Sequence, residues 1–153
     1  MMTITSPAFD HQALIPSRYT CEGENVSPPL VFSTVPDSAK SLVLLMEDPD
    51  VPCHIRSDGM WNHWVVFDMP PFTPGIDEDA TPPGTVGLST RKVNAYGGPC
   101  PPDREHRYFF RLHALDTMLG LPEESTKSDV LRAMAGHVLE QAELMGRYKL
   151  TVR

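Results

Sequence analysis

Proline recurs along the whole chain and limits how much of it can be helical. The 153 residues include 16 prolines, about twice the average usage, and a proline inside a helix removes a hydrogen bond and clashes with the preceding turn. Short runs of apolar, β-branched and aromatic residues lie between the prolines and glycines, a pattern typical of an all-β sandwich or barrel. The runs that predict strands are residues 30–35, 40–46, 63–69, 107–115 and 148–152. The length fits a single domain over residues 1–153.

One segment near the C-terminus departs from this strand pattern. Thr126 and Asp129 have the spacing of a capping box at the start of a helix. Apolar residues then recur at three- and four-residue spacings, at Val130, Leu131, Met134, Val138, Leu139, Ala142 and Met145. Gly146 is well placed to end the helix. The spacing predicts one amphipathic helix over residues 128–145, with its apolar stripe packed against the sheet rather than facing a partner.

Composition and charge exclude several classes of function. The net charge of −7 argues against nucleic acid as a partner, because such binding depends on clustered Lys and Arg. The first ten residues lack the features of a secretory signal, and the longest apolar run, residues 42–46, is too short to span a bilayer, so no membrane insertion is expected. The three cysteines, Cys21, Cys53 and Cys100, are odd in number and widely spaced, which argues against a disulfide framework. A reducing compartment, the cytoplasm, is therefore the expected location.

Polar residues gather at the ends of predicted strands, beside proline-marked loops. The three clusters are residues 47–52, residues 61–64, and the loop 97–102 followed by His106 and Tyr108. Since His106 and Tyr108 stand two positions apart on a strand, their side chains lie on one face. Each cluster alone has an ordinary structural explanation, because Asp before Pro opens turns and a histidine between aromatic residues is more often part of a core. Together, at strand ends, they favour a site carried by a rigid scaffold.

Three motifs in this order resemble the phosphatidylethanolamine-binding protein family. They are Asp48-Pro49-Asp50-Val51-Pro52, Trp61-Asn62-His63-Trp64, and Tyr96-Gly97-Gly98-Pro99-Cys100-Pro101-Pro102 with His106-Arg107-Tyr108. The likeness is greatest to the bacterial Raf-kinase-inhibitor-like branch (YbhB/YbcL) and extends over nearly the whole chain. It implies a mainly β fold of two antiparallel sheets with Greek-key connections, plus one C-terminal α-helix. It also implies a binding protein rather than an enzyme, without a cofactor and with a regulatory or inhibitory role.

The resemblance further implies a rigid pocket for a small anion, such as phosphate or a phosphoethanolamine headgroup. By motif position, the ligand-binding residues are Asp48, Asp50, His63, Gly98, Cys100, Pro101, His106 and Tyr108. The animal members have a glycine where Cys100 stands, so a side chain here is expected to narrow the pocket.

The chemistry of these residue types is compatible with an anion site. Imidazole N–H groups, the Tyr108 hydroxyl and a backbone N–H of the glycine-rich loop are donors, and protonated His63 or His106 would add positive charge. Asp48 and Asp50 would either keep the imidazoles cationic or bind the ammonium of a zwitterionic headgroup.

Other functions stay open at this stage. The residues of metal-ligating type are Asp48, Asp50, Cys53, His54, His63, Cys100 and His106, but no local chelate spacing occurs. A hydrolase would use Cys100 or a serine as nucleophile with His63 or His106 as base, although no G-x-S-x-G elbow is present. The chain could also act as an interaction module whose protein partner is unknown, and a homodimer is left open.

Overall fold

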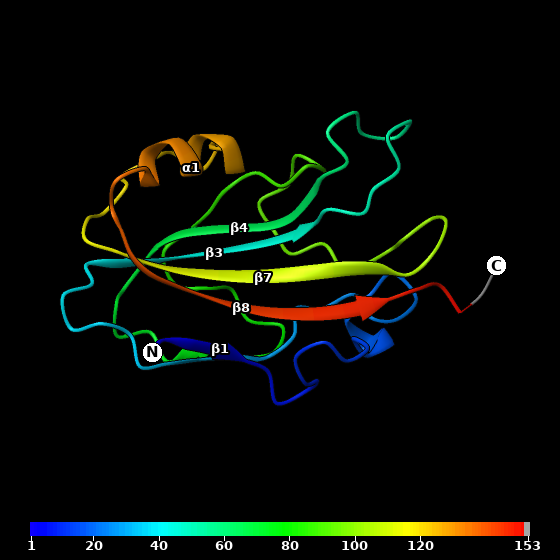
Figure 1. Ribbon diagram of the computed structural model, residues 1–153, viewed down its shortest axis with the longest axis horizontal. Coiled ribbons are helices and arrows are strands. Elements are labelled where there is room, and N and C mark those ends of the chain that lie inside the picture. Colours follow the sequence, from blue (N-terminus) through cyan, green and yellow to red (C-terminus); the bar gives the residue numbers. More distant parts are fainter. Residues whose placement is uncertain (152–153) are drawn as a thin grey trace.

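The computed structural model describes residues 1–151 and consists of three layers (Figure 1). The middle layer is a five-stranded antiparallel sheet in the order β6 (Thr85–Val86), β4 (Trp61–Met69), β3 (Ser41–Asp48), β7 (His106–Leu115) and β8 (Val138–Tyr148). One face of this sheet is covered by the helix α1 (Lys127–Met134). The other face packs on a smaller sheet in the order β1 (Thr3–Thr5), β2 (Leu30–Ser33) and β5 (Gly75–Ile76). A single 3-10 turn, η1 (Ser17–Tyr19), follows β1.

The connections in the larger sheet follow a Greek key. β3, β4 and β6 are antiparallel neighbours in the sheet, and β7 then returns to pair with the free side of β3. The chain visits the smaller sheet through β5 between β4 and β6, and the return of β7 to the strand that began the series is the Greek-key feature of the connection. The predicted mainly β fold with two antiparallel sheets, Greek-key connections and one helix is confirmed.

β3 is buried along its whole length because it is central in the sheet and covered on both faces. Leu42, Leu44 and Met46 belong to the core between the two sheets, whereas Val43 and Leu45 belong to the core under α1. Burial on both faces explains why this strand reads as a continuous apolar run instead of alternating. The strand carries Glu47 and Asp48 at its end, and both carboxylates are buried.

The predicted helix over residues 128–145 is wrong in extent. α1 begins with the predicted capping box of Thr126 and Asp129, but it ends at Met134, and Gly136 follows with φ +82°. Residues 138–148 instead form β8, which pairs with β7 along its whole length. Spacings of three and four residues recur by chance in this strand, and Gly136 is the residue whose conformation ends the helix.

Gly146 has a role other than ending a helix. It lies in β8 opposite Tyr108, and a Cβ at this position would overlap the side chain of Ile15. Residues 12–15 run beside this part of β8, where Ile15 N donates to Arg147 O at 2.8 Å. The glycine therefore allows the N-terminal segment to approach the strand closely.

Four of the five predicted strands are confirmed as β2, β3, β4 and β7, with small shifts at their ends. The fifth, residues 148–152, is wrong, because β8 ends at Tyr148 and residues 149–151 are not extended strand, while Val152 lies outside the described residues. No helix within residues 1–151 has the length and hydrophobicity needed to cross a membrane.

Candidate functional site

A cavity of about 310 Å³ opens at one end of the five-stranded sheet. Because β3 runs antiparallel to its neighbours β4 and β7, the end of β3 and the starts of the other two strands meet at this edge. Asp48, Trp61 and His106 occupy these three strand ends, and the Gly- and Pro-rich loop forms a further wall. The residues that line the cavity are Asp48, Val51, Ile55, Trp61, His63, Arg91, Gly98, Cys100, Pro101, Pro102, His106 and Tyr108.

Seven of the eight residues predicted for the site line this cavity, and Asp50 does not. The carboxylate of Asp50 accepts hydrogen bonds from the backbone N–H and the guanidinium of Arg107, at 2.8–3.0 Å. These bonds lower the pKa of Asp50, so the group is a carboxylate that is already paired. Asp50 fixes the start of β7 instead of facing a ligand.

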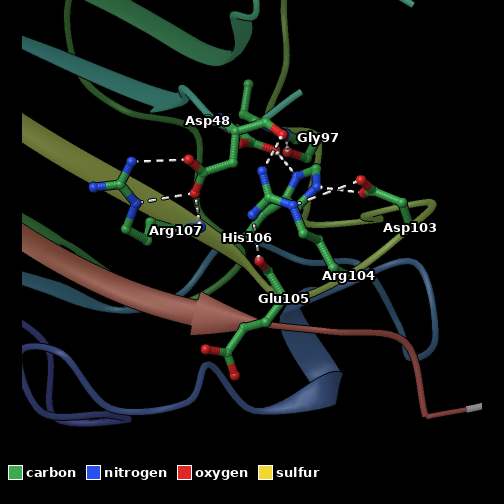
Figure 2. A network of polar contacts seen from close by, with 9 residues as sticks. Asp48, Gly97, Asp103, Arg104, Glu105, His106 and Arg107 are labelled. Atoms are coloured by element: carbon green, nitrogen blue, oxygen red, sulfur yellow. Dashed lines mark hydrogen bonds and ion pairs between the residues drawn. The ribbon is translucent and has the colours of Figure 1, made fainter. Parts of the chain in front are cut away.

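His106 is held between two carboxylates (Figure 2). Its Nδ1 lies 2.6 Å from Oδ2 of Asp48, and its Nε2 lies 2.7 Å from Oδ1 of Asp103. Two such bonds need a proton on each nitrogen with two carboxylates, or a neutral ring with one protonated carboxyl group. In either case, the three side chains together carry one net negative charge.

The contacts of His106 correct one expectation from the sequence. Because both ring nitrogens are engaged and the side chain is fully buried, His106 has no N–H free to donate to an anion. Asp48 is fixed as well, since its other oxygen accepts from the backbone N–H of Asp50 at 2.8 Å. Burial raises the pKa of Asp48, and the hydrogen bond from His106 opposes this rise. His106 contributes a ring surface and a fixed charge distribution to the cavity wall.

His63 carries one hydrogen bond that determines its tautomer. Its Nδ1 lies 2.7 Å from the carbonyl oxygen of Gly97, which can only accept, so Nδ1 carries the proton. Burial lowers the pKa of His63 to about 4, the hydrogen bond to Gly97 opposes this shift, and the neighbouring His106 and Arg91 add to it. At neutral pH the ring is therefore neutral, contrary to the expectation of a cationic His63. Its Nε2 has no hydrogen-bond partner among residues 1–151.

Tyr108 presents an unsatisfied hydroxyl. The side chain is fully buried and lines the cavity, and its oxygen forms no hydrogen bond of normal geometry in the described part of the chain, although the Asp48 carboxylate lies close enough to act on it as an acceptor. Burial raises the pKa of the phenol, with a further contribution from the Asp48 carboxylate, so the hydroxyl keeps its proton. The ring packs edge-on against the His63 ring, with 5.3 Å between the ring centroids, and stacks on the His106 ring, with 6.4 Å between the centroids.

The Gly- and Pro-rich loop of residues 97–102 is held against residues 19–25 by hydrogen bonds. Gly98 N–H donates to Oδ1 of Asn25 at 2.9 Å, and Cys21 N–H donates to the carbonyl of Pro99 at 3.1 Å. A side chain at position 98 would overlap the Tyr19 carbonyl, which explains the glycine. The loop is rigid, as predicted, but the N–H of Gly98 is engaged within the protein and cannot serve the ligand.

A disulfide joins Cys21 to Cys100, contrary to the prediction from the cysteine count. The two residues are 79 positions apart in sequence, yet the clamped loop brings their Cα atoms to 5.5 Å. Cys53 is the third cysteine and is exposed. Since Cys100 is bonded, it is not a thiol nucleophile, and the residues that line the cavity include neither a serine nor a free cysteine.

Arg91 is the charged cavity residue that the sequence motifs do not predict. Its exposed side chain lies near His63 and forms no salt bridge with any residue of the described range. It lies in the irregular segment between β6 and β7, where no periodic pattern or motif identifies it. The apolar part of the wall comes from Trp61, Val51 and Ile55. In residues 1–151, no group of three or more His, Cys, Asp or Glu side chains is placed to hold a metal ion.

Comparisons with known proteins agree with this arrangement of fold and pocket. The sequence model described as phosphatidylethanolamine-binding protein matches residues 5–149. A UPF0098 protein of Chlamydia pneumoniae is 49% identical over 148 residues, which cover 97% of this chain and 99% of the relative. A UPF0098 protein of Methanothermobacter thermautotrophicus is 48% identical over 154 residues, with the same coverage of both chains.

Two solved structures are similar over nearly the whole chain. The crystal structure of a phosphatidylethanolamine-binding protein homolog from Chlamydia trachomatis superimposes with a TM-score of 0.95 at 48% identity, covering 97% of both chains. Escherichia coli YbcL, described as a member of the mammalian family, superimposes with a TM-score of 0.88 at 26% identity, covering 98% of this chain and 99% of YbcL.

Proposed function

Because the chain belongs to the phosphatidylethanolamine-binding protein family, we propose that its cavity binds a small phosphate-bearing anion, such as phosphate or a phosphoethanolamine headgroup. The observation that carries this proposal is the buried hydroxyl of Tyr108, a residue that lines the cavity and whose oxygen forms no hydrogen bond of normal geometry within residues 1–151. Buried polar groups are almost always hydrogen-bonded, so an orphaned donor in a cavity wall points to a ligand that accepts from it.

The charges around the cavity support the same class of ligand. Arg91 supplies a guanidinium that forms no salt bridge within residues 1–151, and guanidinium groups recognise phosphate through paired hydrogen bonds. The cluster of Asp48, His106 and Asp103 supplies one net negative charge at the cavity wall. A zwitterionic headgroup satisfies both, with its phosphate toward Tyr108 and Arg91 and its ammonium toward the carboxylates.

The proposal describes a binding protein without enzymatic activity. Asp48 and His106 are fixed by their contacts, and the lining residues include neither a serine nor a free cysteine. With a net charge of −7, we expect the ligand to be a free or presented headgroup and not a bilayer or a nucleic acid. The regulatory role and the cytoplasmic location remain predictions. The disulfide between Cys21 and Cys100 removes the argument for a reducing compartment that was based on the number of cysteines.

Calorimetric titration with phosphate and phosphoethanolamine tests the proposal, with Tyr108→Phe as the diagnostic variant. A hydrogen bond to a charged group contributes about 1.5–3 kcal/mol, so the variant should bind roughly ten- to a hundredfold more weakly. Tyr96→Phe is the matched control, because its hydroxyl donates to the Tyr19 carbonyl at 2.8 Å, away from the cavity. Unchanged affinity in Tyr108→Phe, or no binding to wild type, would reject the anion site.

A further inference from the structure

A groove follows the edge of the smaller sheet. It consists of three depressions of about 380, 470 and 210 Å³. The first and second share Pro74, and the second and third share Ala80 and Thr81, so the three are continuous. They border residues 71–82 in order, with β5 in the middle, and no strand of the described residues pairs with the outer side of β5. Connected depressions along one stretch of chain fit an extended ligand better than a compact one.

The groove is separate from the cavity proposed to bind an anion. Ala39 precedes β3 and Pro71 follows β4, so the first depression lies at the strand ends opposite to Asp48 and Trp61. The groove comes near the loop 97–102 only at its other end, where Asn25 lines it and accepts from Gly98 N–H. The groove and the cavity have no lining residue in common, so their ligands can be tested independently.

The wall of the groove is largely apolar and partly exposed. Phe72 in the first depression is 84% exposed, and Val31 in the second is 41% exposed. Apolar side chains that stay exposed in adjoining depressions mark an interaction surface. Prolines fix much of the backbone, so little of it has to be ordered on binding. They are Pro36, Pro71, Pro74, Pro82 and Pro83.

The charged residues that line the groove are all acidic. Asp37 lines the first depression, Asp77 the second and Asp79 the third. All three are exposed and form no salt bridge within residues 1–151, whereas Glu78 is paired with Arg18. None of the residues lining the three depressions is Lys, Arg or His. Each depression therefore offers apolar surface and one unpaired carboxylate, which complements a chain that carries both apolar and cationic side chains.

From this arrangement, we propose that the groove docks an extended, cationic segment of a partner protein. Lys or Arg side chains of the segment face the three aspartates, and its Pro or aliphatic side chains fill the depressions. A polyproline II conformation suits this role, because it has no internal hydrogen bonds and brings every third side chain into one row. A second copy of this chain fits poorly, since its net charge is −7 and its own groove is acidic.

The test is titration of isotope-labelled protein, followed by NMR, with three synthetic peptides of three repeats each. The repeat Lys-Pro-Val is cationic and extended, Glu-Pro-Val reverses the charge, and Lys-Gly-Ser keeps the charge without the apolar side chains. The Lys-Pro-Val peptide should shift the backbone amides of Val31, Gly75 and Asp77. It should bind at least about tenfold more tightly than either of the other peptides, and more weakly as salt is added.

Several results would overturn the proposal. Equal affinity for Glu-Pro-Val or for Lys-Gly-Ser would show that charge or apolar contact plays no part. Absence of shifts at millimolar Lys-Pro-Val, or shifts confined to the anion cavity around Gly98 and His106, would show that the groove is not a docking site for such a segment. Shifts of Val31 and Gly75 that grow with protein concentration alone would show that a second copy covers the groove.

A combined variant, Asp37→Asn, Asp77→Asn and Asp79→Asn, tests the three carboxylates. Asn tolerates the positive φ of 58° at position 79. An exposed ion pair contributes a factor of about 1.4–5 in affinity, so the variant should bind Lys-Pro-Val about three- to a hundredfold more weakly. The control has the same change of net charge at exposed acids outside the groove, in Asp10→Asn, Glu123→Gln and Glu124→Gln. Equal affinity in the variant and its control would contradict the proposal, because general negative charge would then explain the binding.

Phe72→Ser tests the apolar part of the groove. Because the ring is 84% exposed, its loss should leave the midpoint of thermal unfolding nearly unchanged. The loss of its contact with the peptide should weaken Lys-Pro-Val binding by at least about fivefold. The weak binding of Lys-Gly-Ser should stay as it is, since that peptide has no apolar side chain to place against the ring. Unchanged affinity for Lys-Pro-Val would contradict the proposed placement of the segment.

Discussion

His113 should be the origin of a measurable loss of stability in acid. It lies on β7, is 7% exposed, and neither of its ring nitrogens has a hydrogen-bond partner within residues 1–151. Burial lowers its pKa to about 4, with Arg111 adding to the effect and Glu47 opposing it. In the unfolded chain a histidine titrates near pH 6.5, so below that pH the unfolded state binds a proton that the folded state does not. Stability is therefore complete above about pH 6.5 and is lost as the pH falls towards 4.

The size of this effect follows from the difference between the two pKa values. About 2.5 pKa units at 1.36 kcal/mol each give a loss of about 3 kcal/mol by pH 4. His113→Phe keeps a planar ring, removes the titration and removes two unsatisfied polar atoms. We expect it to lessen the acid loss by about 3 kcal/mol and to be more stable than wild type at pH 7 by about 1–3 kcal/mol.

Urea unfolding of wild type and His113→Phe at several pH values between 7.5 and 4 measures both effects. His54→Phe is the control, because His54 is exposed and its replacement should change stability by less than about 0.5 kcal/mol at any pH. Since the pKa of His63 is also lowered to about 4, the variant should retain roughly half of the acid loss due to the two histidines. Parallel curves for wild type and His113→Phe would show that the ring is hydrated or bonded in solution, and would refute the reasoning.

Three further perturbations probe the site and its support. Arg91→Ala should weaken phosphate binding and reduce its dependence on salt concentration, whereas Lys92→Ala, also exposed and next in sequence, should leave both unchanged in calorimetric titrations. Gly146→Ala should destabilise the protein by about 1–3 kcal/mol through overpacking against the N-terminal segment, and an unchanged midpoint in urea would contradict the close approach. Replacing Cys21 and Cys100 by serine should lower the unfolding free energy by up to about 4.5 kcal/mol, the loop-entropy value for a separation of 79 residues. Equal midpoints for that variant and oxidised wild type would show that the disulfide does not stabilise the fold.

The sequence predicts those residues of the site that lie close to one another in the chain. His106 and Tyr108 stand two apart on a strand, and the loop before them is marked by Gly and Pro, so pattern and resemblance both point to them. The roles of these residues depend on contacts across 34 to 58 positions, as for His63 with Gly97 and His106 with Asp48. No one-dimensional pattern reveals that one histidine is a neutral acceptor and the other is fully engaged.

The wrong predictions about the fold have the same origin. The apolar residues of 130–145 fit a helical spacing, but β7 offers a complete row of partners for residues 138–148, and this pairing outweighs the local preference. The odd number of cysteines argues against a disulfide, yet pairing depends on distance in space, and the contacts between residues 19–25 and the loop 97–102 supply that proximity. Arg91 has no pattern around it, and only the cavity reveals it.

The fixed contacts of the cavity explain how so few groups can define its ligand. Asp50 is bound to Arg107, His106 lies between Asp48 and Asp103, and Gly98 donates to Asn25, so these groups are bonded before any ligand arrives. Ordering them costs nothing on binding, which favours affinity for a ligand as small as one phosphate group. What remains is one lone pair, one hydroxyl proton and one guanidinium. A zwitterionic phosphoethanolamine headgroup can satisfy all three, because its ammonium group can donate to Nε2 while its phosphate oxygens accept from the hydroxyl and the guanidinium.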